Sequence, residues 1–74
     1  MEKNIFIRLK NEGTEVFRPV KALLINNNVY QIIQPMPEDE EWEFESGERV
    51  ICKEKLLDGE ILMVAEARSE ASSR

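Results

Sequence analysis

The sequence has no histidine and only one cysteine, Cys52, among its 74 residues. A lone cysteine excludes a disulfide within the chain, and a zinc site built from several Cys and His ligands is excluded as well. Without histidine, neither a Cys–His nor a Ser–His–Asp nucleophile can be assembled from this chain alone. The three glycines are far apart in the sequence, so there is no Gly-rich phosphate loop. We expect Cys52 to be a small buried hydrophobe and expect no cofactor.

Long apolar runs are missing too. The longest uncharged stretch, residues 22–36, is interrupted by three asparagines and two glutamines, so no transmembrane helix is expected. The apolar stretch near the start contains Arg8 and Lys10, which argues against a signal peptide. A lone cysteine fits a reducing compartment. The expected location is therefore the cytoplasm.

Positive charge is scarce in the second half of the chain. Residues 1–34 have a net charge of +2, residues 35–74 have a net charge of −7, and the whole chain has −5. A nucleic-acid-binding protein needs clustered positive charge to displace counterions from phosphate. Attraction to an anionic membrane is disfavoured for the same reason. We expect neither nucleic acid nor membrane as a partner.

Short strand-like runs separated by turn residues recur along the chain, whereas helical periodicity is weak. Residues 11–14, 26–28 and 46–47 are typical of turns, and Asp58-Gly59 favours a tight type I′ hairpin. Pro19 cannot donate to a ladder, so its strand is expected to lie at an edge or to bend there. The expected strands are residues 5–9, 15–25, 29–35, 49–57 and 61–65.

Five short strands in so small a chain bury their apolar faces best by curling into a barrel, which also removes exposed edges. We predict an all-β domain over residues 1–67, a small five-stranded antiparallel SH3-like barrel. An OB-like barrel or an open β-sandwich is the alternative. Residues 68–74 are rich in Ser, Glu and Ala and are expected to form a flexible tail.

The most unusual segment is residues 38–48, called here the acidic loop, which has seven carboxylates in eleven positions together with Trp42 and Phe44. One interpretation is a docking surface for a basic partner, with an aromatic anchor. The other is that both rings close one end of the barrel and the acids are solvated. Arg18 is either an anion receptor or, as we favour, a barrel-mouth arginine paired with an acid of this loop. The candidate partner-binding residues are Arg18, Glu38, Asp39, Glu40, Glu41, Trp42, Glu43 and Glu45.

Two other uses of the carboxylates are less favoured. Calcium loops alternate Asp and Asn around a glycine, whereas residues 38–45 are mostly Glu, contain no glycine and would alternate between two sides of an extended chain. Acid–base catalysis needs a pocket of about 300 Å³ or more, and we expect a small barrel to offer little such volume. No metal site and no enzyme activity are expected.

A spaced pattern of short motifs runs through much of the chain. Its residues are Glu12, Gly13, Thr14, Val16, Arg18, Pro19, Val20, Ala22, residues 39–44, Gly47, Val50, Cys52 and Glu54. This ordered combination resembles a group of small, stand-alone, uncharacterised bacterial proteins. The spacing of Phe44, Gly47 and Val50 also looks like the turn-into-strand element of many SH3-like barrels. The resemblance spans about residues 5–66 and implies a fold and a bacterial source, but no activity.

These observations favour a non-enzymatic protein-interaction module that binds a basic partner through the acidic loop. A self-assembling or accessory structural subunit is the first alternative, because the run at residues 29–35 is apolar on both faces and a second copy could cover it. A nucleic-acid-binding barrel is the second alternative, by analogy of fold alone, and the net charge disfavours it.

Overall fold

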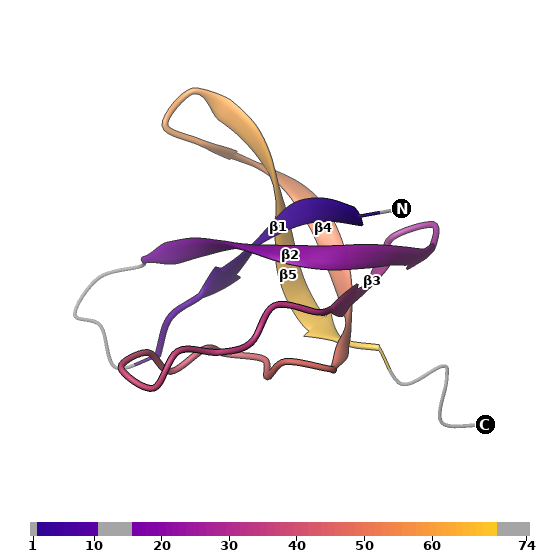
Figure 1. Ribbon diagram of the computed structural model, residues 1–74. Coiled ribbons are helices and arrows are strands. Elements are labelled where there is room, and N and C mark those ends of the chain that lie inside the picture. Colours follow the sequence, from indigo (N-terminus) through magenta and orange to yellow (C-terminus); the bar gives the residue numbers. More distant parts are fainter. Residues whose placement is uncertain (1, 11–15, 70–74) are drawn as a thin grey trace.

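The computed structural model describes residues 2–10 and 16–69, which form five strands and no helix (Figure 1). No described helix is therefore long and apolar enough to cross a membrane. The strands close into a barrel in the order β1-β2-β3-β4-β5. The predicted small all-β barrel is thus confirmed. The elements are β1 (Glu2–Arg8), β2 (Phe17–Asn26), β3 (Val29–Ile32), β4 (Arg49–Leu57) and β5 (Glu60–Arg68).

Each strand pairs with the next one along the chain, and these four pairs are antiparallel. The barrel is closed by β1 and β5, which pair in parallel with Phe6 opposite Val64. When consecutive strands alternate in direction, the first and the fifth must run the same way. The sheet is therefore mixed, and the wholly antiparallel pairing that we predicted does not hold for the closing pair.

Two tight turns follow from their residues. Asp58 and Gly59 have φ angles of 51° and 80°, as a type I′ hairpin turn requires, so this prediction is confirmed. Asn27 and Asn28 reverse the chain between β2 and β3, so the turn predicted at residues 26–28 is confirmed, but neither adopts the positive φ for which asparagine was expected there. The turn predicted at residues 11–14 lies outside the described residues.

The strand boundaries differ from the prediction mainly in β1, β3 and β5. β1 begins at Glu2, three residues before the expected start, and ends at Arg8. β3 ends at Ile32, because the chain leaves the sheet before Pro35 and begins the long connection to β4. β5 continues to Arg68, three residues beyond the expected end, and Ser69 N–H donates to the carbonyl of Arg49. Arg68 and Ser69, which we assigned to the tail, are thus ordered against β4.

Pro19 lies at a local edge of the sheet, as predicted. It is opposite Phe6 of β1, but β3 pairs with β2 only from Ala22 onward. The backbone N–H and C=O of Lys21 both bond toward the β3 side. Because alternate residues of a strand share the direction of these groups, the nitrogen of Pro19 points to the same side, beyond the end of β3.

One main core fills the barrel. It contains alternate residues of β1 and β2 and reaches Val50 and Cys52 at the start of β4. Trp42 and Phe44 enter this core from the connection between β3 and β4. No buried side-chain polar atom among the described residues lacks a hydrogen bond. The buried core residues are Ile5, Ile7, Val20, Ala22, Tyr30, Ile32, Trp42, Phe44, Val50, Cys52 and Ala65.

The β4–β5 hairpin extends past the barrel on the side where β2 begins (Figure 1). Within the described part of the chain, residues 54–57 and 60–63 pair only with each other. One face of the hairpin carries Leu56 opposite Ile61 and continues, toward the barrel, into the buried pair Cys52 and Ala65. The other face carries Leu57, Lys55 and Lys53, which lie opposite Glu60, Leu62 and Val64.

Candidate functional site

The acidic loop is fastened across one end of the barrel by main-chain hydrogen bonds. Lys10 N–H donates to the carbonyl of Glu41 at 2.7 Å, and Glu43 N–H donates to the carbonyl of Arg8 at 2.9 Å. Between these bonds, Leu9 and Trp42 form an antiparallel bridge. The loop therefore follows the end of β1 as a short extended segment, which sends alternate side chains to opposite sides.

The inward side of this segment carries both aromatic rings. Trp42 is 2% exposed and Phe44 is 5% exposed. Of the two interpretations of the loop, closure of the barrel end by these rings is therefore confirmed. Trp42 cannot be the exposed aromatic anchor of a docking surface, and that part of the docking hypothesis is wrong. The reason is the hydrophobic effect. Burial removes the large apolar surface of the ring from water, and in so small a core the ring also fills space that few other side chains can fill.

Arg18, Glu40 and Trp42 form a small hydrogen-bonded group at the barrel mouth. The Nε and terminal N–H groups of Arg18 donate to both carboxylate oxygens of Glu40, and the indole Nε1–H donates to Oε1 of the same carboxylate at 3.0 Å. The hydrogen bonds from Trp42 and then from Arg18 lower the pKa of Glu40 below its ordinary value of 4.5. The interpretation of Arg18 as a barrel-mouth arginine paired with the acidic loop is confirmed.

Two more arginines hold acids of the same loop. Arg8 pairs with Glu43 at 3.6 Å, from the end of β1. Arg68 of β5 donates to Glu48 at 2.5 Å, and its guanidinium lies over the ring of Phe44, 5.5 Å from the centroid. The carboxylate of Glu48 also accepts the backbone N–H of Glu45. Glu40, Glu43 and Glu48 therefore fasten the loop to the barrel.

The other acids of the loop face outward. Glu38, Asp39, Glu41 and Glu45 are all exposed. These acids belong to a segment whose backbone is hydrogen-bonded to the end of β1 and whose aromatic rings are buried. Their positions relative to the barrel therefore vary mainly through rotation of their own side chains. No three metal-ligating side chains within residues 2–10 and 16–69 converge on one point. The outward acids are thus a patch of negative charge.

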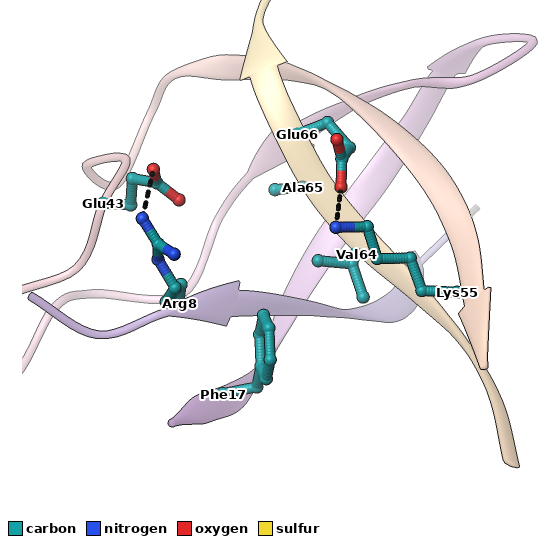
Figure 2. Close-up of a pocket in the computed structure, with 7 residues that line it drawn as sticks. All are labelled: Arg8, Phe17, Glu43, Lys55, Val64, Ala65 and Glu66. Atoms are coloured by element: carbon teal, nitrogen blue, oxygen red, sulfur yellow. Dashed lines mark ion pairs between the residues drawn. The ribbon is translucent and has the colours of Figure 1, made fainter. Parts of the chain in front are cut away.

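A hollow of about 170 Å³ lies beside the loop, between β1, β4 and β5 (Figure 2). Two ion pairs flank it: Arg8 with Glu43 on one side, and Lys55 with Glu66 at 2.6 Å on the other. The hydrogen bond from Lys55 lowers the pKa of Glu66. This hollow has room for water or one small chemical group. Each charged side chain in its lining has an opposite partner, so the hollow has no net charge that would select a charged ligand.

A larger groove of about 500 Å³ lies between the β4–β5 hairpin and the start of β2. Its apolar lining comes from Val16, Phe17, Leu57 and Leu62. Asp58 and Glu60 at the hairpin turn complete it. Phe17 also lines the smaller hollow, so the groove and the hollow meet there. This volume lies outside the barrel, where the hairpin overhangs β2, whereas the core fills the barrel interior.

Cys52 takes no part in these surfaces. It is fully buried, and burial raises the pKa of its thiol to about 12. A neutral, inaccessible thiol is neither a nucleophile nor a metal ligand. The prediction that Cys52 is a small buried hydrophobe is confirmed.

Analysis of the sequence missed the groove residues Phe17, Leu57 and Leu62. A signal was present, because Leu56, Leu57, Ile61 and Leu62 flank the Asp58-Gly59 turn and place apolar side chains on both faces of one hairpin. A two-sided apolar hairpin must be covered on both faces or expose one of them. We considered a two-sided apolar surface only for residues 29–35.

No protein-family model, curated protein or solved structure matches this chain. The resemblance to small bacterial proteins therefore stays a prediction.

Proposed function

We propose that this protein is a small, non-enzymatic interaction module that binds a basic segment of a partner protein at its acidic loop. The observation that carries the proposal is that some acids of the loop pair with arginines of the barrel while others are exposed. Glu40, Glu43 and Glu48 hold the loop to the barrel, while Glu38, Asp39 and Glu45 are exposed on it. A loop that needed its acids only for closure would not require the second set.

Electrostatics supports a weak, fast and salt-sensitive interaction. Charges arranged on a fixed surface steer an oppositely charged partner and raise the association rate. Each exposed ion pair contributes only about 0.2–1 kcal/mol, and salt screens it over a Debye length of about 8 Å at physiological ionic strength. The acidic loop on its own therefore supplies attraction and orientation, and tight binding needs an apolar contact elsewhere.

The experiment uses a fluorescent peptide of sequence Lys-Lys-Ser-Lys-Ser-Lys-Lys, which offers positive charge without an apolar side chain. We expect the double variant Glu38→Gln/Asp39→Asn to bind it about 2- to 30-fold more weakly at low salt, since two pairs of this strength are lost. The matched control, Glu2→Gln/Glu54→Gln, removes the same charge from exposed residues of β1 and β4. Equal weakening by both double variants would show that only the net charge of the protein matters.

A second candidate is self-association through the tip of the hairpin. Leu56 and Ile61 form a cross-strand pair and are 70% and 68% exposed. A second copy could cover this pair. Sedimentation velocity at high micromolar concentration tests this role: a dimer that Leu56→Thr/Ile61→Thr abolishes supports it, and a monomer throughout rejects it.

The proposal also includes a cytoplasmic location and excludes nucleic acid and anionic membranes as partners. The net charge of −5 supports the latter part, because phosphate-rich surfaces repel a protein of this sign.

A further inference from the structure

Apolar side chains gather on the outer face of the barrel as well as inside it. Val64 is only 2% exposed but is not part of the main core cluster. Its strand neighbour across the barrel closure is Phe6, and it lines the hollow beside Phe17. Leu62 lies two residues before Val64 on the same face of the hairpin and lines the adjoining groove. A line of apolar side chains thus runs from the barrel closure into the groove.

This line of contacts connects the groove with the acidic loop. The hollow shares Phe17 with the groove and reaches Glu43 of the loop at its other side (Figure 2). The groove itself ends at Asp58 and Glu60. Asp58 and Glu60 therefore lie at one end of this surface, Glu43, paired with Arg8, lies at the other, and Phe17 lies between them.

We propose that the groove lined by Val16, Phe17, Leu57 and Leu62 seats one or two apolar side chains of a partner segment whose flanking residues are Lys or Arg. This inference rests on the proposed function and names the part of the partner that supplies affinity. The flanking basic residues contact Asp58 and Glu60 on one side and approach the acidic loop on the other. The groove thus has the anchoring role that the buried Trp42 cannot have.

The volume of the groove and the negative charge at its rim favour such a partner segment over other occupants. About 500 Å³ is within the range of ligand-binding sites, whereas the hollow of about 170 Å³ is too small for a peptide side chain with its backbone. A second copy of the chain would bring its own net charge of −5 and its own Asp58 and Glu60 against the same carboxylates. Phosphate-bearing partners meet the same repulsion, while a segment with apolar and basic residues satisfies both the lining and its rim.

The test uses the full chain, labelled with ¹⁵N, and three peptides of equal length. The probe is Lys-Lys-Leu-Lys-Leu-Lys-Lys. One control peptide replaces Leu with Ser, and the other replaces Lys with Glu. We expect the probe to shift the amide signals of Val16, Phe17, Leu57 and Leu62 at saturation. The Ser peptide is expected to shift signals of the acidic loop only, and the Glu peptide to shift neither set.

Variants on the two faces of the same hairpin supply the matched comparison. Leu57→Thr/Leu62→Thr removes apolar lining with residues that suit strands, and we expect the dissociation constant of the probe to rise at least about 10-fold. Leu56→Thr/Ile61→Thr makes the same chemical change on the opposite face and is expected to leave it unchanged. Asp58→Asn/Glu60→Gln is expected to weaken binding of the probe about 2- to 30-fold, since two exposed ion pairs are lost. The turn should be kept, because asparagine tolerates the positive φ of position 58.

The outcomes separate this inference from the proposed function. Equal binding of the Leu and Ser peptides, or equal loss in the two Thr double variants, overturns the groove as the anchoring site. If the Ser peptide then still shifts the acidic loop, the proposed function survives alone. If the probe binds in the groove with the same affinity in wild type and in Glu38→Gln/Asp39→Asn, the groove is supported as the anchoring site and the role of the acidic loop is contradicted. Failure of both Lys peptides to bind overturns both.

Discussion

The acidic loop and the β4–β5 hairpin have properties opposite to those that their sequences suggest. The loop is charged and irregular, yet it contains Trp42 and Phe44, which are 2% and 5% exposed. The hairpin is regular and apolar, yet it contains Leu56 and Ile61, the two most exposed large hydrophobics among the described residues. The difference teaches that burial depends on where an element meets the barrel. The loop crosses an open barrel end, while the hairpin extends beyond its neighbours.

The largest expected effect is on the loop side of this comparison. Replacing Trp42 with Ala should cost about 3–5 kcal/mol of unfolding free energy, because a large ring leaves the core. A domain of this size has only a few kcal/mol in total, so the variant should be largely unfolded. Urea denaturation followed by circular dichroism measures this. An Ala variant of Trp42 as stable as Leu56→Ala would contradict the contrast between the two regions.

A second test compares the base of the hairpin with its tip. With a pKa of about 12, Cys52 has a thiolate fraction at pH 8 about 10³-fold below that of an ordinary thiol, and burial slows access further. Alkylation of the folded protein should therefore be slow and should become fast in urea. In Cys52→Ala/Leu56→Cys, the thiol at the exposed tip should react at the rate of a free cysteine. Equal rates at the two positions would refute the assigned burial.

A smaller effect is expected on the pH dependence of stability that comes from Glu40 in the acidic loop. The folded-state pKa of Glu40 is lowered, so the ionised carboxylate stabilises the fold fully above its ordinary pKa of 4.5. This stabilisation is lost as the pH falls through the lowered pKa. Trp42→Phe keeps a ring but removes the indole donor, and Arg18→Met removes the guanidinium. NMR titration of the Glu40 carboxyl group should show a higher pKa in each variant, and an unchanged pKa would exclude the assigned hydrogen bonds.

The smallest effect on stability is expected at the hairpin tip. Leu56→Thr/Ile61→Thr changes exposed residues and should alter the unfolding free energy by less than about 0.5 kcal/mol per site. Thermal or urea unfolding measures this effect. A loss of several kcal/mol would mean that the tip is covered in solution, and self-association would then be the first explanation to examine.

The regular part of the fold could be predicted because its signals are local. β4 was predicted with its observed bounds, and the Asp58-Gly59 turn has the expected positive φ angles. The strand expected at residues 5–9 overlaps β1, in which Ile5 and Ile7 are fully buried. The pairing of Arg18 with an acid of the loop could also be anticipated. Arg18 alternates in phase with the inward-facing residues of its strand and lies near one end of the barrel. Its long cationic side chain can therefore reach the carboxylates of the loop that lies at that end.

The rest depends on contacts between distant segments. The end of β3 at Ile32 depends on where the connection to β4 must cross the barrel. The choice of Glu40 among seven acids depends on the position of the Trp42 indole, which only the packed core determines. The groove exists because Phe17 and the hairpin turn, about forty residues apart in the sequence, come together where the hairpin overhangs β2. No local pattern contains that information.

Trp42 is the only tryptophan of the chain, so its fluorescence tests the central claim, closure of the barrel by the acidic loop, most directly. The folded protein should emit at shorter wavelength than free tryptophan and should resist quenching by acrylamide, with both properties lost in urea. Emission at the wavelength of free tryptophan, with full quenching under native conditions, would show that the ring lies in solvent and that the loop does not close the barrel.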